Sequence, residues 1–302
     1  MLDSILPEKI ISAIKTLNYA NLQEIRLRAN KPVTVCYCSN FYFLGTNGIV
    51  SGKNNALYLT PTEIADIVHK ASNYSIYTIN DNLKQGYITL SSGERIGIIG
   101  QVVSENGSVI TVKNFSSLNI RIPHEIKGIS NDLMDYLIDD GEFLNTLIVS
   151  SPAVGKTTLL RDIVRNLSST QFAKNVLVVD ERNEISATSN GESAMDLGDF
   201  SDIITFSNKE FAFTNGIRSM SPDIIATDEI GTKCDYDAIL RASSCGVKIL
   251  ATIHAKDIDE LLRKTDFMVL KNYKTFKRYV VLKLINGKRV FDKIYDENFE
   301  EL

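Results

Sequence analysis

The second half of the chain alternates short apolar segments with longer amphipathic ones. The apolar segments carry polar residues at their ends; they are NTLIVS from residue 145, NVLVVD from 175, DIIATDE from 223 and KILATIHA from 248. Helical patterns such as TTLLRDIVRNL and DYDAILRASSCG lie between them. Strands that are apolar at nearly every position are buried on both faces, and strands that alternate with helices form parallel sheets. The sequence therefore predicts an α/β domain with a mainly parallel sheet covered by helices.

A phosphate-binding loop is indicated where the first strand meets its helix. The stretch SSPAVGKTT, residues 150–158, follows the pattern G-x-x-x-x-G-K-[ST], except that Ser150 replaces the first glycine. In such loops, backbone N–H groups surround the phosphates, the lysine reaches the β- and γ-phosphates, and the next hydroxyl binds Mg²⁺. We therefore expect Lys156 to bind ATP and Thr157 to ligate Mg²⁺, with the rest of the cradle formed by Ser151, Pro152, Ala153, Val154, Gly155 and Thr158.

Two carboxylates at the end of a later strand favour a working nucleotide site over a chance match to the loop pattern. Asp228 and Glu229 follow the apolar residues of DIIAT. ATPases of this kind hold Mg²⁺ with an acidic residue at the end of a neighbouring strand, and parallel strands bind ligands at their carboxyl edge. We expect Asp228 to orient the Mg²⁺ shell and Glu229 to polarise the attacking water.

Two further strands end in polar residues that could serve the same edge. Asp180 is the last residue of NVLVVD and Glu181 follows it, and His254 lies near the end of KILATIHA. A lone histidine is more often structural, but at this edge it could position water or contact the γ-phosphate. Both interpretations of His254 remain open.

The first part of the chain has a different pattern and predicts a smaller α+β domain over residues 1–118. Thr60, Pro61 and Glu63 form a helix start, while the segment QEIRLR alternates as a strand does. Residues 119–141 are expected to connect this domain to the nucleotide-binding domain at 142–302, with a helix over NDLMDYLID. Within that second domain, the pair Asn286-Gly287 predicts a β-hairpin turn.

The composition argues against two other classes of protein. The formal net charge is −4, so a broadly basic surface that binds nucleic acid is not expected. No apolar run reaches the length of a transmembrane helix, and the start MLDSILPEKI lacks the pattern of a signal peptide. We expect a cytosolic protein that neither inserts directly into a membrane nor binds nucleic acid.

Four motifs in a fixed order resemble the secretion-type (traffic) ATPases of the RecA-like superfamily. They are SPAVGKTT, VVDERNEI, IRSMSPDIIATDEIG and AILRASSCGVKILATIHA. Within that family the whole chain is similar to the stage III sporulation members of endospore-forming bacteria, on the segments LPEKI, QEIRLRANKPV, GERIGIIGQ and LNIRIP. The resemblance implies a RecA-like P-loop core and a homo-oligomer in the form of a hexameric ring, with ATP and Mg²⁺ held between domains and subunits.

The same resemblance implies a role and a place in the cell. Such a member would energise a channel complex across the double membrane between mother cell and forespore, recruited from the mother-cell cytoplasm by membrane proteins. A nucleotide-gated structural scaffold with little hydrolysis is the first alternative. A nucleic-acid motor is the second, although no RNA-binding appendage is visible.

Two questions about residue roles stay open under this resemblance. Many relatives have glycine where this chain has Asp228, so the base is not decided between Glu229, Asp180 and Glu181. Arginines of the N-terminal domain reach the nucleotide in this family, but alternating arginines on a strand also form ordinary solvated faces. The candidates are Arg26 and Arg28, for which both interpretations are equal, and Arg95 and Arg121, for which function is favoured.

Overall fold

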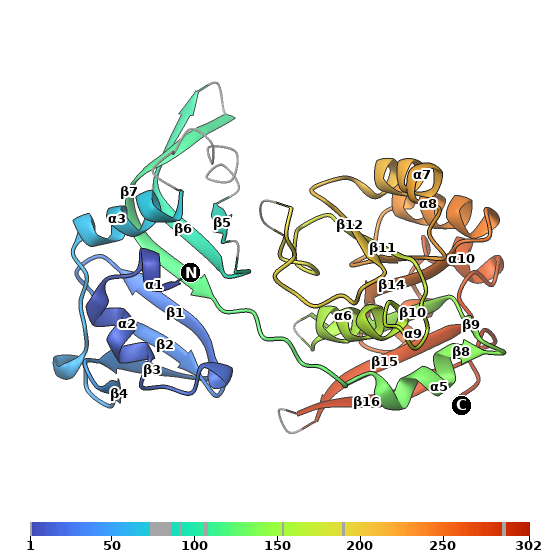
Figure 1. Ribbon diagram of the computed structural model, residues 1–302, viewed down its shortest axis with the longest axis horizontal. Helices are drawn as coiled ribbons and strands as arrows, with labels where there is room; N and C mark the ends of the chain where they lie inside the picture. Colours follow the sequence, from blue (N-terminus) through green and yellow to red (C-terminus); the bar gives the residue numbers. More distant parts are fainter. Residues whose placement is uncertain are drawn as a thin grey trace. The chain divides into compact units, whose positions relative to one another are not determined.

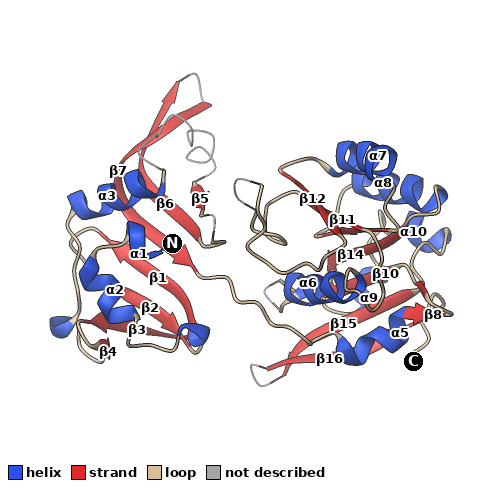
Figure 2. Ribbon diagram, in the orientation of Figure 1, coloured by secondary structure: helices blue, strands red, loops and turns tan. Residues whose placement is uncertain are grey.

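The computed structural model describes residues 2–72, 86–90, 92–105, 108–152, 154–188, 191–285 and 288–302. It divides the chain into two compact units, each with its own sheet (Figures 1 and 2). The first unit comprises Met1–His124 with Ala187–Ala194, and the second comprises Glu125–Ser186 with Met195–Leu302.

The described residues of the first unit form an antiparallel sheet in the order β4-β3-β2-β1-β7-β6-β5. Helices α1 (Leu2–Ile5), α2 (Glu8–Ile14) and α3 (Pro61–Ala71) pack against this sheet. The strands are β1 (Leu22–Arg28), β2 (Thr34–Tyr37), β3 (Asn40–Gly45), β4 (Gly48–Val50), β5 (Tyr87–Thr89), β6 (Arg95–Glu105) and β7 (Ser108–Arg121). An α+β architecture was expected for this part of the chain, and the structure has one.

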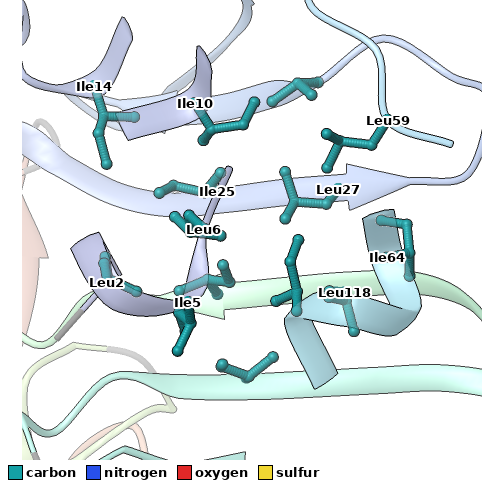
Figure 3. Packing of buried hydrophobic residues seen from close by; sticks show 14 of the residues in the cluster. Leu2, Ile5, Leu6, Ile10, Ile14, Ile25, Leu27, Leu59, Ile64 and Leu118 are labelled. Carbon is teal, nitrogen blue, oxygen red and sulfur yellow. The ribbon is translucent and has the colours of Figure 1, made fainter. Parts of the chain in front are cut away.

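Alternation along β1 decides which face of this sheet is buried. Ile25 and Leu27 are fully buried and meet apolar side chains of α1, α2 and α3 in one core (Figure 3). Complete burial of such a side chain contributes roughly 1.5–3 kcal/mol to stability. The predicted start of α3 is confirmed, because the Thr60 hydroxyl accepts the Glu63 N–H at 3.2 Å and the Glu63 carboxylate accepts the Thr60 N–H at 2.8 Å.

The second unit has the α/β fold that the sequence predicts. Its described strands lie in the order β12-β11-β13-β14-β10-β15-β16, and all pairs except β15 with β16 are parallel. These strands are β10 (Thr146–Ser150), β11 (Val176–Asp180), β12 (Ser201–Thr205), β13 (Ile224–Thr227), β14 (Lys248–His254), β15 (Arg278–Ile285) and β16 (Lys288–Tyr295). The predicted turn at Asn286-Gly287 lies outside the described residues.

Helices cover both faces of this sheet, as its central strands, which are buried on both faces, require. One core contains Leu147 and Val149 of β10 with residues of α7 (Lys209–Met220) and α8 (Lys233–Ser244). The other contains Ile148 of the same strand with residues of α6 (Lys156–Leu167). Helices α9 (Ile258–Leu262) and α10 (Met268–Asn272) add Leu261 and Leu270 to the first of these cores.

The segment predicted as a connector, 119–141, has several distinct parts. Strand β7 continues to Arg121, so the first residues of the segment belong to the sheet of the first unit. The run NDLMDYLID was expected to be a single helix. It instead forms a 3-10 turn at Asn131–Leu133, the short α5 (Met134–Leu137) and the strand β8 (Ile138–Asp139), which pairs with β9 (Glu142–Phe143).

None of the described helices is both long enough and apolar enough to span a membrane.

Candidate nucleotide-binding site

The predicted phosphate loop lies between β10 and α6, in the strand–loop–helix context that the motif requires. Gly155 precedes the first residue of α6 and has φ 114° and ψ 25°. Glycine adopts this left-handed conformation without the strain that a side chain would add. The first turn of a helix leaves backbone N–H groups without intrahelical acceptors, and these can bind phosphate oxygens. Val154 is buried in the core beneath the loop, and Ala153 lies outside the described residues.

Ser150 is the last residue of β10 rather than part of the loop. It lies opposite His254 in the parallel pairing with β14, and its carbonyl accepts the Ala255 N–H at 3.3 Å. Its side chain is fully buried. An extended strand residue needs no positive φ, so serine at this position causes no backbone strain. The structure thus explains how the loop can form without its first glycine.

Lys156 is folded back onto the loop and onto the end of β14. Its Nζ donates to the carbonyls of Ser150 and Ser151, both at 3.2 Å, and lies 2.7 Å from Nδ1 of His254. Burial lowers the pKa of Lys156 to about 8, while the charge of Glu229 acts in the opposite direction.

His254 connects the loop lysine to Glu229. Its Nε2 lies 3.1 Å from Oε1 of Glu229, while its Nδ1 accepts a hydrogen bond from the Lys156 ammonium. An ammonium has only donors, so Nδ1 must accept and the proton of a neutral ring must be on Nε2. Side chains from the loop, β14 and the end of β13 therefore form one continuous chain, Lys156–His254–Glu229.

The strand that carries the two carboxylates is not the direct neighbour of the loop strand. Strand β14 lies between β13 and β10, so the expectation of an adjacent strand is corrected. The insertion puts His254 between Lys156 and Glu229. The Glu229 N–H donates to the Thr252 hydroxyl of β14 at 2.9 Å, which holds the residue at this edge.

Asp228 and Glu229 have different surroundings. Asp228 is 6% exposed, and no residue in the described part of the chain donates a hydrogen bond to its carboxylate. Burial, followed by the charge of Asp180, raises the pKa of Asp228 to about 7. The Glu229 side chain is 39% exposed and also meets Arg182 at 3.2 Å. Asp228 is thus a buried carboxyl with no hydrogen-bond donor among the described residues, whereas Glu229 is partly exposed and held in place by its contacts.

The Asp180 carboxylate is bonded to the backbone that follows β11. It accepts the N–H groups of Glu184 at 2.8 Å, Ile185 at 3.0 Å and Ser186 at 2.7 Å, and the Ser186 hydroxyl at 2.7 Å. Asp180 is fully buried. These contacts fold the loop after β11.

Glu181 pairs with Lys209, a residue that the sequence analysis did not select. Lys209 Nζ lies 2.7 Å from Glu181 Oε2. Nothing in the local pattern SNKEF distinguishes this lysine from a solvated one at the start of a helix. Its importance becomes visible only through its burial in the folded chain.

The candidate arginines of the first unit gather near one end of its sheet. Arg95 and Arg121 are opposite each other on β6 and β7, and Arg121 is also opposite Glu24 of β1. Glu24 pairs with Arg26 at 2.8 Å and with Arg121 at 3.4 Å, while the Arg95 guanidinium lies 3.7 Å from the centre of the Tyr87 ring. Arg28 is directed instead to the Thr34 hydroxyl at 3.3 Å.

The oxygen groups of the second unit fit Mg²⁺ in the manner of a phosphate-loop protein. Thr157 is half-buried in the first turn of α6, and Asp228 offers a carboxylate to which none of the described residues donates a hydrogen bond. The described residues contain no cluster of three or more His, Cys, Asp or Glu that could hold a metal ion by itself. Mg²⁺ commonly uses one or two protein ligands together with water and substrate phosphates, so such a cluster is not required.

Solved structures of two other proteins share the fold of this chain. The ATPase DotB of Legionella pneumophila superposes with a TM-score of 0.60 at 15% identity, over 92% of this chain and 78% of that one. The pilus retraction motor PilT, solved with bound ADP, superposes with a TM-score of 0.62 at 17% identity, over 95% and 82% of the two chains. The chain thus has the RecA-like fold of the secretion ATPases.

Sequence comparison identifies the family within that class. The sequence model of the family described as Sporulation stage III, protein AA matches residues 3–302. Stage III sporulation protein AA of Bacillus subtilis (strain 168) is 35% identical over 302 residues, which cover 97% of this chain and 94% of that protein. The chain belongs to the Sporulation stage III, protein AA family.

Proposed function

We propose that this protein is a Mg²⁺-dependent ATPase that energises a secretion-like complex in sporulation. The observation that carries the proposal is the contact chain Lys156–His254–Glu229, with distances of 2.7 and 3.1 Å. It joins the phosphate-binding lysine to an accessible carboxylate at one edge of a RecA-like sheet. Family membership and the likeness to secretion ATPases support the same function.

The residues present can divide the work of hydrolysis among them. Lys156 turns from the loop carbonyls to the β- and γ-phosphates, and this frees Nδ1 of His254. Thr157 and Asp228 would hold Mg²⁺, which would neutralise charge on the phosphates. His254 then contacts the γ-phosphate, and Glu229 takes the proton of the attacking water.

Glu229 is the base that the contacts favour. The Asp180 carboxylate is occupied by four hydrogen bonds from the loop that it folds, and Glu181 is paired with a buried ammonium. Glu229 is far more accessible than the fully buried Asp180, and the Thr252 hydroxyl fixes its backbone. A carboxylate that must receive a proton needs such access.

The assembly and its location are part of the proposal. The protein forms a hexameric ring with nucleotide at the subunit interfaces, where Arg95 or Arg121 meets charge on the γ-phosphoryl group. Membrane proteins recruit the ring to the mother-cell side of a channel complex. The gathering of Arg95 and Arg121 on neighbouring strands supports a shared role for these two residues.

A nucleotide-gated scaffold with little hydrolysis is the competing function. It is favoured by one observation: Lys156 and Glu229 are both occupied through His254. Steady-state phosphate release from the purified protein separates the two functions, because a scaffold would bind ATP without sustained release.

Two substitutions test the ATPase directly. Lys156→Ala removes the cation that binds the phosphates, so both ATP binding and turnover should be lost. Glu229→Gln keeps the shape but removes the base, so binding should persist while turnover falls by roughly 100-fold or more. Binding is measured with a fluorescent ATP analogue and turnover by phosphate release.

Lys233→Ala is a matched control, because Lys233 is exposed and also begins a helix. Unchanged hydrolysis by Lys156→Ala would reject the loop assignment. Normal turnover by Glu229→Gln together with loss in Glu181→Gln would move the base to Glu181.

A further inference from the structure

Lys209 is a buried lysine between two carboxylates that come from different elements. It is the first residue of α7 and only 4% exposed. Its Nζ lies 2.7 Å from Glu181 Oε2, after β11, and 3.9 Å from Asp235 Oδ1, in the first turn of α8. A lysine is rarely buried unless it is paired, and removing one partner of a buried pair is costly. The three side chains therefore join the starts of α7 and α8 to the end of β11.

One of these carboxylates holds the backbone that follows Glu229. The Asp235 Oδ2 atom accepts the N–H of Gly231 at 3.0 Å and the N–H of Thr232 at 2.9 Å. The Thr232 hydroxyl accepts the Asp235 N–H at 3.2 Å, which completes a capping box. Gly231 and Thr232 lie two and three residues after Glu229. Asp235 thus fixes the backbone that follows the proposed base in the sequence.

The other carboxylate belongs to the segment whose next residue, Arg182, contacts the Glu229 side chain. Glu181 immediately precedes Arg182, whose guanidinium lies 3.2 Å from Glu229 Oε2. Lys209 forms a close ion pair with Glu181 and a longer one with Asp235. Both segments around Glu229 are consequently tied to one buried ammonium.

We propose that Lys209 is the positioning residue for Glu229. It holds the Arg182 segment through Glu181 and the Gly231–Thr232 segment through Asp235. It also pairs with the charge of Glu181, the rival carboxylate at this edge. This inference rests on the proposed ATPase function and adds a residue to its machinery.

The test compares Lys209→Met, which keeps length without charge, with Lys209→Arg, which keeps the charge. In Lys209→Met we expect kcat to fall by about 10-fold or more, with affinity for the ATP analogue within about 2-fold of the unsubstituted protein. Lys209→Arg should recover part of kcat. Lys233→Met is the surface control and should change neither value.

The Glu229→Gln background distinguishes positioning from general stabilisation. If Lys209 acts through Glu229, then adding Lys209→Met to Glu229→Gln should cause little further loss of turnover, since the base is already absent. Equal losses in both backgrounds would overturn the inference, and so would an unchanged kcat in Lys209→Met alone. Absence of turnover in the unsubstituted protein would instead reject the ATPase function itself.

Asp235→Asn is the second variant, for use if Lys209→Met does not fold. The amide oxygen can still cap α8, but the charge that faces Lys209 is removed. We expect the same pattern: a lower kcat, preserved binding, and little added effect in the Glu229→Gln background. An unchanged kcat in a folded Asp235→Asn protein would overturn the inference.

Discussion

At the scale of single residues, the most unusual group of the site is the Asp228 carboxyl. Burial and the nearby charge of Asp180 raise its pKa to about 7, from 3.8. In the unfolded chain the same group ionises near its ordinary value. In the absence of metal, the folded protein therefore favours the protonated carboxyl. The free energy of unfolding decreases as the pH rises from about 4 to about 7, because the unfolded carboxyl loses its proton first.

Asp228→Asn should stabilise the metal-free and nucleotide-free protein at about pH 8 and have little effect at about pH 4.5. The difference between these conditions is about 3 kcal/mol, because the pKa is raised by roughly three units and the unfolded carboxyl is already mostly ionised at about pH 4.5. Urea unfolding of both proteins at the two pH values measures it. An equal effect at both pH values would contradict the cause given for the raised pKa.

At the scale of elements, helix α6 has a second role besides forming the phosphate loop. Its residue Asp162 accepts the N–H of Gly128 at 2.9 Å, and the N–H and hydroxyl of Ser130 both at 2.8 Å. Arg165, one turn further along, donates to the same carboxylate at 2.7 Å. The helix whose N-terminus would bind phosphate thereby also holds the chain that leads into the second unit.

Asp162→Asn should destabilise the second unit by roughly 2–3 kcal/mol, because an amide cannot accept all of these hydrogen bonds. Burial alone would raise the pKa of Asp162, but the hydrogen bonds from Ser130, Gly128 and Arg165 lower it. The stabilisation is therefore present above the ordinary pKa of aspartate and is lost in acid as the pH falls through the lowered value. Urea unfolding at neutral and acidic pH measures both effects.

Asp237→Asn, on the exposed face of α8, is the matched control for Asp162 and should be nearly neutral. A free energy of unfolding for Asp162→Asn equal to that of the control would show that the carboxylate does not hold Gly128 and Ser130.

At the scale of the whole molecule, the two units have separate hydrophobic cores, and each can be described without the other. The proposed catalytic chain is contained in the second unit, whereas the candidate arginines Arg95 and Arg121 belong to the first. A ring that brings an arginine to the site of another subunit would make activity depend on assembly.

Specific ATPase activity should therefore rise with protein concentration in step with the mass of the oligomer. The comparison uses phosphate release together with light scattering over the same dilution series. Lys156→Ala should assemble like the unsubstituted protein but remain inactive, because the substitution is confined to the loop. Constant specific activity across a change of oligomeric state would reject a site shared between subunits.

Several features of this protein could be predicted from local sequence patterns alone. Apolar strands such as 146–149 and 176–179 have to be buried on both faces, so the parallel sheet and its covering helices followed from the alternation of segments. Parallel strands end at a common edge, which put Asp180, Asp228 and His254 on the same side of one sheet. The capping pattern at Thr60 is also local, and the structure has it.

Other features depended on contacts that no local pattern encodes. The strand order put β14 between β10 and β13, and only this order makes His254 the link between Lys156 and Glu229. Lys209 looks like a surface lysine until the packing of α7 and α8 buries it. Sequence periodicity reports which face of an element is apolar, whereas the pairing of distant side chains is set by strand order and packing, which only the tertiary structure decided.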